Sequence, residues 1–159
     1  MSICSLAELL ARGVRVEPHE AVAVAQQLID CGAAAPTPDT IRLHADGRIE
    51  CVGRDATPGV YEIAIFLQTL LPVDRVGVPG GLRYAIARGL HEVEARPYDT
   101  VAELSATLER FEKGDRRAVV AALVGRMQST RPTDVVSSRP RRTRCPATNS
   151  NALGSTLSV

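Results

Sequence analysis

A segment of alternating apolar residues, set between helical patterns, constrains the fold of this chain most. In residues 40–52 an apolar side chain recurs at every second position on both sides of Asp46-Gly47. An Asp-Gly pair between two such arms is a strong signal for a β-hairpin. The alternating residues are Ile41, Leu43, Ile49 and Cys51. We therefore expect one small hairpin inside a chain whose other segments are helical.

Helical spacing and helix-end signals surround this hairpin. Ser5 with Glu8, and Thr100 with Glu103, form capping boxes, and Pro18 suits the first position of a helix. The predicted helices cover residues 5–13, 18–31, 60–71, 80–89, 100–111 and 115–127. The helix at 60–71 is apolar at nine of its twelve positions, so we expect it to be buried on most sides and central. The predicted fold class is mainly α with one small β-hairpin, an α+β domain.

Charge divides the chain into a body and a tail. Residues 1–128 hold 14 basic and 17 acidic side chains, whereas residues 129–159 hold 5 basic and 1 acidic. The tail is rich in Ser, Thr, Pro and Arg and has too few apolar residues to offset the entropy of ordering. We expect a helical domain at 1–128 and a disordered basic tail at 129–159.

The remaining composition indicates a cytoplasmic protein without a metal site. No apolar run reaches the roughly 18 residues of a membrane span, and the first residues lack the pattern of a signal peptide. The four cysteines form no Cys-x-x-Cys pair and no Cys/His cluster at metal-binding spacing. We expect Cys31 and Cys51 to be small apolar core residues.

The order of these elements resembles the C-terminal lobe of protein kinases. Residues 5–13 resemble the helix after the kinase hinge, and 38–52 the hairpin after the catalytic loop. The segment Val-Tyr-Glu-Ile-Ala-Ile-Phe-Leu at 60–67 is similar to the buried central helix of that lobe. Ala-Arg-Pro at 95–97, with Val-Ala-Glu-Leu at 101–104, resembles a segment near the end of the lobe. The resemblance covers about residues 5–112 and implies a kinase C-lobe-like fold.

The departures from the kinase pattern imply that the chain is not an enzyme. The N-terminal lobe, with its glycine loop and strand lysine, has no counterpart before residue 5. Ala35 stands in the position of the catalytic Asp, and Thr40 in that of the metal-binding Asn. Asp55 could replace the metal-binding Asp only with a two-residue slip. Six residues between Gly53 and Val60 replace the activation loop. We expect no cofactor, no metal and no catalytic residue.

The sequence contains three further features of the kind that can form functional sites. His44 and His91 have no nucleophile or paired carboxylate at suggestive spacing, so an acid/base role is not favoured. The glycine-rich segment 77–81 lacks the strand and lysine of a phosphate-binding turn, which favours a plain loop. The tail carries Arg139, Arg141, Arg142 and Arg144. These arginines are either an electrostatic contact for nucleic acid or an anionic surface, or a solubilising terminus.

The resemblance points to a non-catalytic protein-interaction or scaffolding module, similar to a pseudokinase or to the kinase C-lobe domains called KIND domains. A lobe without its partner lobe and activation loop should expose apolar surface, which marks interaction sites. The candidate partner-binding residues lie around the first two helices and the hairpin: Leu9, Leu10, Val14, Val16, Pro36, Pro38 and the separate Arg96. The alternatives are a nucleotide binder or enzyme that needs a separate N-lobe, and a binder of anionic polymers through the tail.

Overall fold

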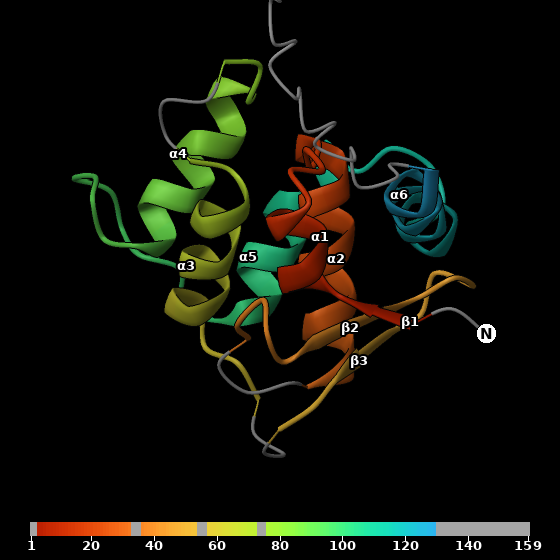
Figure 1. Cartoon of the computed structure of the whole chain (residues 1–159). Coiled ribbons are helices and arrows are strands. Elements are labelled where there is room, and N and C mark those ends of the chain that lie inside the picture. The colour runs from red at the N-terminus through yellow and green to blue at the C-terminus, as the bar shows by residue number, and fades with distance from the viewer. Residues whose placement is uncertain (1–2, 33–35, 54–56, 73–75, 130–159) are drawn as a thin grey trace, which may run out of the picture.

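The protein folds into a helical domain with a small sheet on one side (Figure 1). The computed structural model describes residues 3–32, 36–53, 57–72 and 76–129. The strands in this part of the chain are β1 (Ile3–Ser5), β2 (Ile41–His44) and β3 (Ile49–Cys51). The α-helices are α1 (Leu6–Ala11), α2 (Pro18–Cys31), α3 (Val60–Leu70), α4 (Gly80–Gly89), α5 (Val101–Leu108) and α6 (Arg116–Ser129), and a 3₁₀ turn (Glu109–Phe111) extends α5. The expected α+β class is confirmed, and none of these helices is long and apolar enough to cross a membrane.

The sheet is an antiparallel arrangement of three strands in the order β1-β2-β3. Leu43 faces Ile49 in the predicted hairpin and Cys4 on β1, so Leu43 lies in the middle of the sheet. Strand β1 was not predicted, because three residues before a helix carry no readable alternation. Gly47 in the hairpin turn has a positive φ of 79°, and a Cβ atom there would collide with the backbone carbonyl of Arg117. The turn therefore packs directly on the first turn of α6.

Helix α2 is the central element, and this corrects the prediction that the helix at 60–71 is central. Helix α2 contacts α3, α5, α6 and β3, and every residue from Glu20 to Gln26 is buried. Helix α3 buries one side only: Ile63 and Phe66 are in the core, whereas Tyr61 is 50% and Ile65 42% exposed. The core therefore does not use all the apolar residues of α3, because Tyr61 and Ile65 stay exposed beside the polar Glu62 and Thr69.

The predicted helix ends are largely confirmed. The Ser5 side chain accepts from the Glu8 amide while the Glu8 carboxylate accepts from the Ser5 amide, which is a complete capping box. At α5 the Thr100 hydroxyl accepts from the Glu103 amide as expected, but the Glu103 carboxylate accepts from the Asp99 amide instead. These local bonds fix where the chain enters each helix.

Polar side chains in the interior connect α2 to its neighbours. Gln26 is fully buried, its Nε2 donating to the Ser105 carbonyl at 2.8 Å and its Oε1 accepting from the Ser105 hydroxyl at 2.6 Å. Gln27, which is half-buried, donates to the carbonyls of Gly47 and Arg116. Both side-chain amides thus have hydrogen-bond partners in the protein, which replace the water molecules they would contact in the unfolded chain. These bonds hold α5, the hairpin turn and α6 against one helix.

Candidate interaction surface

Most of the predicted partner-binding residues lie in the protein's own core. Leu9 is 0%, Val16 2% and Val14 9% exposed, and Pro36 is buried as well. The physical reason is that α1 folds back on the hairpin, with the Ala7 amide donating to the carbonyl of Pro38. Leu10 and Pro38 are half-buried. The expectation of an open apolar face at these residues is therefore wrong, because the chain itself covers it.

Arg96 lies on the surface rather than in a buried ion pair. Its side chain is 79% exposed and its guanidinium bonds to the Asp99 carboxylate three residues along the chain. Exposed pairs of this kind contribute only about 0–1 kcal/mol. Arg96 therefore has no structural role that the geometry makes evident.

Other sequence candidates fall outside the described residues or have ordinary surroundings. The four tail arginines, Arg139, Arg141, Arg142 and Arg144, lie outside, as do Ala35 and Asp55 at the kinase-like positions. The Thr40 hydroxyl donates to the Thr37 carbonyl inside a turn. Within the described ranges, no group of three or more His, Cys, Asp or Glu is placed to hold a metal ion.

His44 and the cysteines Cys31 and Cys51 have ordinary surroundings as well. His44 pairs with Glu50 across the hairpin at 3.3 Å, a surface contact. Cys51 packs against the core, partly as expected, but Cys31 is exposed at the end of α2. The prediction that Cys31 is a core residue is wrong, because the helix ends in solvent at that point.

An exposed apolar face on α3 and α4 emerges instead. Tyr61 and Ile65 are one turn apart on α3, and Tyr84 on α4 is 53% exposed. The two helices lie side by side at the edge of the molecule (Figure 1). We call the exposed and half-buried residues on this side of α3 and α4, with the turn that follows α4, the α3–α4 face: Tyr61, Ile65, Gln68, Arg83, Tyr84, Ala87, His91 and Glu92. Tyr61 and Ile65 are part of the apolar pattern that predicts burial of this helix, and the structure places both on the surface.

A groove runs along this face. Its volume is about 210 Å³, and its wall is formed by Gln68, Leu71, Arg83, Tyr84, Ile86, Ala87 and Glu92. The floor is apolar, since Leu71 and Ile86 are buried beneath it. Charge is confined to its two ends on α4, with Arg83 near the start of the helix and Glu92 just after its end. An apolar groove with polar ends is a common form of a protein-binding surface.

The base of the face is rigid. Gly89 allows α4 to approach α3 closely, because a Cβ atom at residue 89 would lie 2.8 Å from the Cβ of Ala64. Behind α4, the Arg88 side chain donates to the Arg96 carbonyl at 2.6 Å and to Glu103 at 2.9 Å, and it lies over the Tyr98 ring at 4.0 Å. Arg88 thus joins α4 to the segment that leads into α5 and to α5 itself. A rigid surface loses little entropy when it binds a partner.

The end of the face carries a residue in an unusual backbone conformation. His91 has φ of 60°, the left-handed region that non-glycine residues seldom adopt. This turn lets the Glu92 amide donate to the Ala87 carbonyl at 2.9 Å, so Glu92 returns to the groove. The His91 ring stacks on Tyr61 with the ring centres 6.5 Å apart. The left-handed turn therefore places both His91 and Glu92 on the α3–α4 face.

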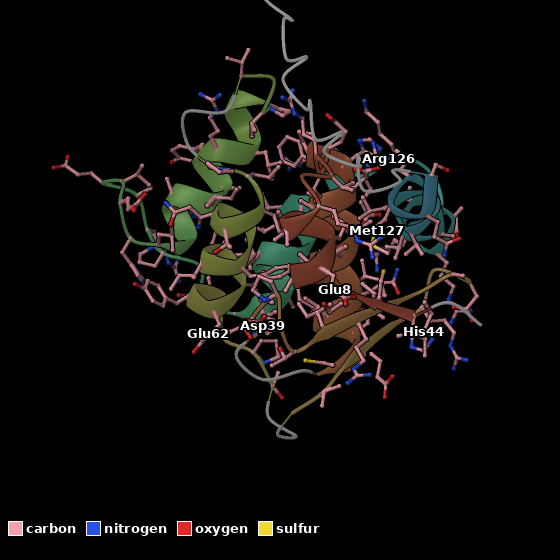
Figure 2. The ribbon with its side chains drawn as sticks, in the orientation of Figure 1. Glu8, Asp39, His44, Glu62, Arg126 and Met127 are labelled. Carbon is pink, nitrogen blue, oxygen red and sulfur yellow. The ribbon has the colours of Figure 1, made fainter. Side chains whose placement is uncertain are left out.

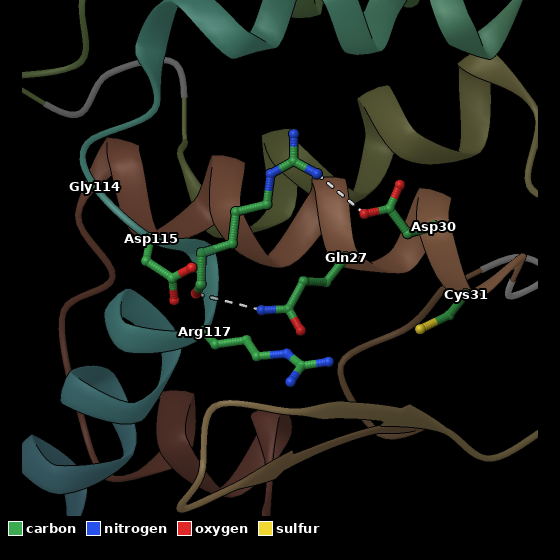
Figure 3. A pocket seen from close by; sticks show the side chains of 7 residues that line it. Gln27, Asp30, Cys31, Gly114, Asp115 and Arg117 are labelled. Carbon is green, nitrogen blue, oxygen red and sulfur yellow. Dashed lines mark hydrogen bonds and ion pairs between the residues drawn. The ribbon is translucent and has the colours of Figure 1, made fainter.

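A second, more polar pocket lies between α2 and α6 (Figure 3). It measures about 440 Å³ and contains Asp30, Cys31 and Arg117. Arg116 in its wall donates to Asp30 at 3.0 Å and to Glu112 at 2.7 Å. Arg116 therefore links Asp30 on α2 to Glu112 just before α6, which gives these three charges a structural role.

Comparison with known proteins adds no family to this description. No protein-family model matches the chain, and a search of curated proteins also finds no match.

Proposed function

We propose that this protein is a non-catalytic interaction module that binds a protein partner through the α3–α4 face. The observation that carries the proposal is the exposure of Tyr84, which lines the apolar groove, and of Tyr61 and Ile65 on the neighbouring helix α3. Aromatic residues are enriched where proteins bind one another, and they account for a large share of binding energy. An apolar helix face that the core does not use is available for such a contact.

The resemblance to a kinase C-lobe is part of the same proposal. It is supported by the order of two helices, a hairpin and four further helices, with an Asp-Gly turn in the hairpin. The replacement of the catalytic Asp and metal-binding Asn by Ala35 and Thr40 favours binding over catalysis. The lobe-like domain would then serve as a scaffold that presents α3 and α4.

A comparison of two surface variants tests this function. Tyr84→Glu places a charge in the middle of the α3–α4 face. Val52→Glu is the matched control, because Val52 is 48% exposed and lies after the hairpin, away from the groove. Wild type and both variants are immobilised, and the proteins they retain from native lysate are quantified by mass spectrometry.

We expect a specific set of proteins to be retained by wild type and Val52→Glu and lost by Tyr84→Glu. Equal retention by all three would contradict binding at this face. Calorimetric titration with Mg-ATP is the second arm, and saturable binding would favour the alternative of a nucleotide binder. Binding that disappears only on removal of residues 130–159, and weakens steeply with salt, would favour the anionic-polymer alternative.

A further inference from the structure

We propose that the partner on the α3–α4 face is a second copy of this chain, with α4 packed antiparallel against α4 around a two-fold axis. This inference rests on the proposed function, because it names the occupant of the same face. A two-fold interface must be self-complementary. If residue i of the first copy contacts residue j of the second, then residue j of the first copy also contacts residue i of the second. The α3–α4 face meets this condition in the placement of its charges and of its aromatic residues.

The charge pattern is the first argument. Arg83 lies at one end of the groove and Glu92 at the other, and both line it. Antiparallel packing of two α4 helices brings Arg83 of each copy to Glu92 of the other. Parallel packing would instead oppose Arg83 to Arg83 and Glu92 to Glu92. The two ion pairs therefore select the antiparallel register, as complementary charges do in other interfaces.

The aromatic residues of the face lie next to its charged residues in the chain. Tyr84 directly follows Arg83 on α4, and His91 directly precedes Glu92 in the turn after the helix. The register that pairs the charges therefore also brings Tyr84 to His91, whose ring is already stacked on Tyr61. Aromatic groups brought together in this way attract one another beyond the gain from burying their apolar surface. Ala87 lies close to the axis, where a small side chain lets the two helices approach.

The size of the face predicts how tight the dimer is. Helix α4 has ten residues, which corresponds to a length of about 15 Å. A contact of this length is at the small end of specific protein interfaces. We expect a reversible dimer whose population depends on protein concentration, rather than an obligate one.

Sedimentation velocity over a range of concentrations, with the full chain, tests the proposal. Wild type should shift from monomer to dimer as concentration rises. Arg83→Glu and Glu92→Arg each place like charges at both symmetric contacts, so each variant alone should raise the dissociation constant at least about tenfold. Glu94→Arg is the control, because Glu94 is exposed and does not line the groove, and it should sediment as wild type does.

An equimolar mixture of the Arg83→Glu and Glu92→Arg variants is the decisive measurement. In the mixed dimer the glutamate introduced at position 83 of one copy meets the arginine introduced at position 92 of the other. At the second contact the native Arg83 and Glu92 meet as they do in wild type. We therefore expect a heterodimer close to wild-type affinity from two chains that do not self-associate, a recovery that a misfolded variant could not show.

Two results would overturn the proposal: wild type that stays monomeric over the whole concentration range, or a dimer that neither variant weakens. The proposed function can be separated from this inference by the lysate experiment. Wild type could be monomeric and still retain from the lysate a protein other than this chain, which Tyr84→Glu does not retain. In that case the interaction function stands, and only the second copy as its partner is rejected.

Discussion

Arg126 on α6 reaches Glu20 on α2, and its Nη2 atom lies 2.6 Å and 2.5 Å from the two carboxylate oxygens. Figure 2 shows Arg126 on α6, near the end of the described chain. Glu20 is only 5% exposed, and its carboxylate also accepts from the Glu17 amide at 2.7 Å. This contact joins residues 106 positions apart and holds the last helix on the central one.

Replacing Arg126 by Met should destabilise the domain by about 1–3 kcal/mol. The methionine keeps the apolar stem but leaves the buried Glu20 carboxylate without its cation. Urea unfolding followed by circular dichroism measures the change. Arg117→Met on the same helix is the control, because the Arg117 side chain is exposed, and its effect should stay within about 0.5 kcal/mol. Equal effects of the two variants would show that the pair with Glu20 contributes nothing.

Gly47→Ala should destabilise the protein more than Gly13→Ala, although both glycines have positive φ. Alanine at Gly13, with φ of 71° and open space around it, should cost about 1–2 kcal/mol from the left-handed backbone alone. At Gly47 the new methyl also meets the Arg117 carbonyl, and displacing that backbone should add about 1–3 kcal/mol. The difference between the two free energies of unfolding isolates the packing of the hairpin turn on α6. Equal losses would mean that the turn does not lie against α6 in solution.

Cys31 should react with a thiol reagent at least roughly tenfold faster than Cys4 in the folded protein. Burial raises the pKa of the Cys4 thiol, with the nearby Glu8 carboxylate adding to the shift, and only the thiolate reacts. Cys4 is also 4% exposed, so local opening must precede its modification. Timed alkylation followed by peptide mass spectrometry gives both rates. The difference should vanish in denaturant, and equal rates without denaturant would contradict the burial of Cys4.

The features that could be predicted from the sequence are those fixed by short-range physics. The hairpin follows from Asp46-Gly47, and the helix starts follow from Ser5, Pro18 and Thr100, because a cap or turn is decided by residues within a few positions. Strand β1 escaped prediction because its hydrogen bonds go to residues about 39 positions away, such as Leu43 opposite Cys4. Composition alone does not encode such a pairing.

Burial was harder to predict than secondary structure. For this reason the sequence did not identify which residues form the exposed apolar surface. Leu9, Val14 and Val16 were expected to face a partner, yet they pack inside, because the resemblance gave no information on what covers α1. Tyr61 and Ile65 were expected inside, yet they face solvent. An apolar helix is consistent with a buried core or with a binding face, and only its neighbours distinguish the two.

Glu103 should make the stability of the α4–α5 region depend on acid pH. The Asp99 amide lowers the pKa of the Glu103 carboxyl, and the Arg88 guanidinium adds to this effect. Since the folded pKa lies below the unfolded value of about 4.3, the stabilisation is fully present above that value and is lost as pH falls through the folded pKa. Glu103→Gln, which cannot ionise, should therefore show a smaller loss of thermal stability between pH 6 and pH 3 than wild type. Glu109→Gln serves as the control for removal of an exposed carboxylate from the same stretch of chain, and it should keep the wild-type acid dependence. If wild type and Glu103→Gln lose the same thermal stability between pH 6 and pH 3, the Glu103 carboxylate does not bind the Asp99 amide and the Arg88 guanidinium in solution.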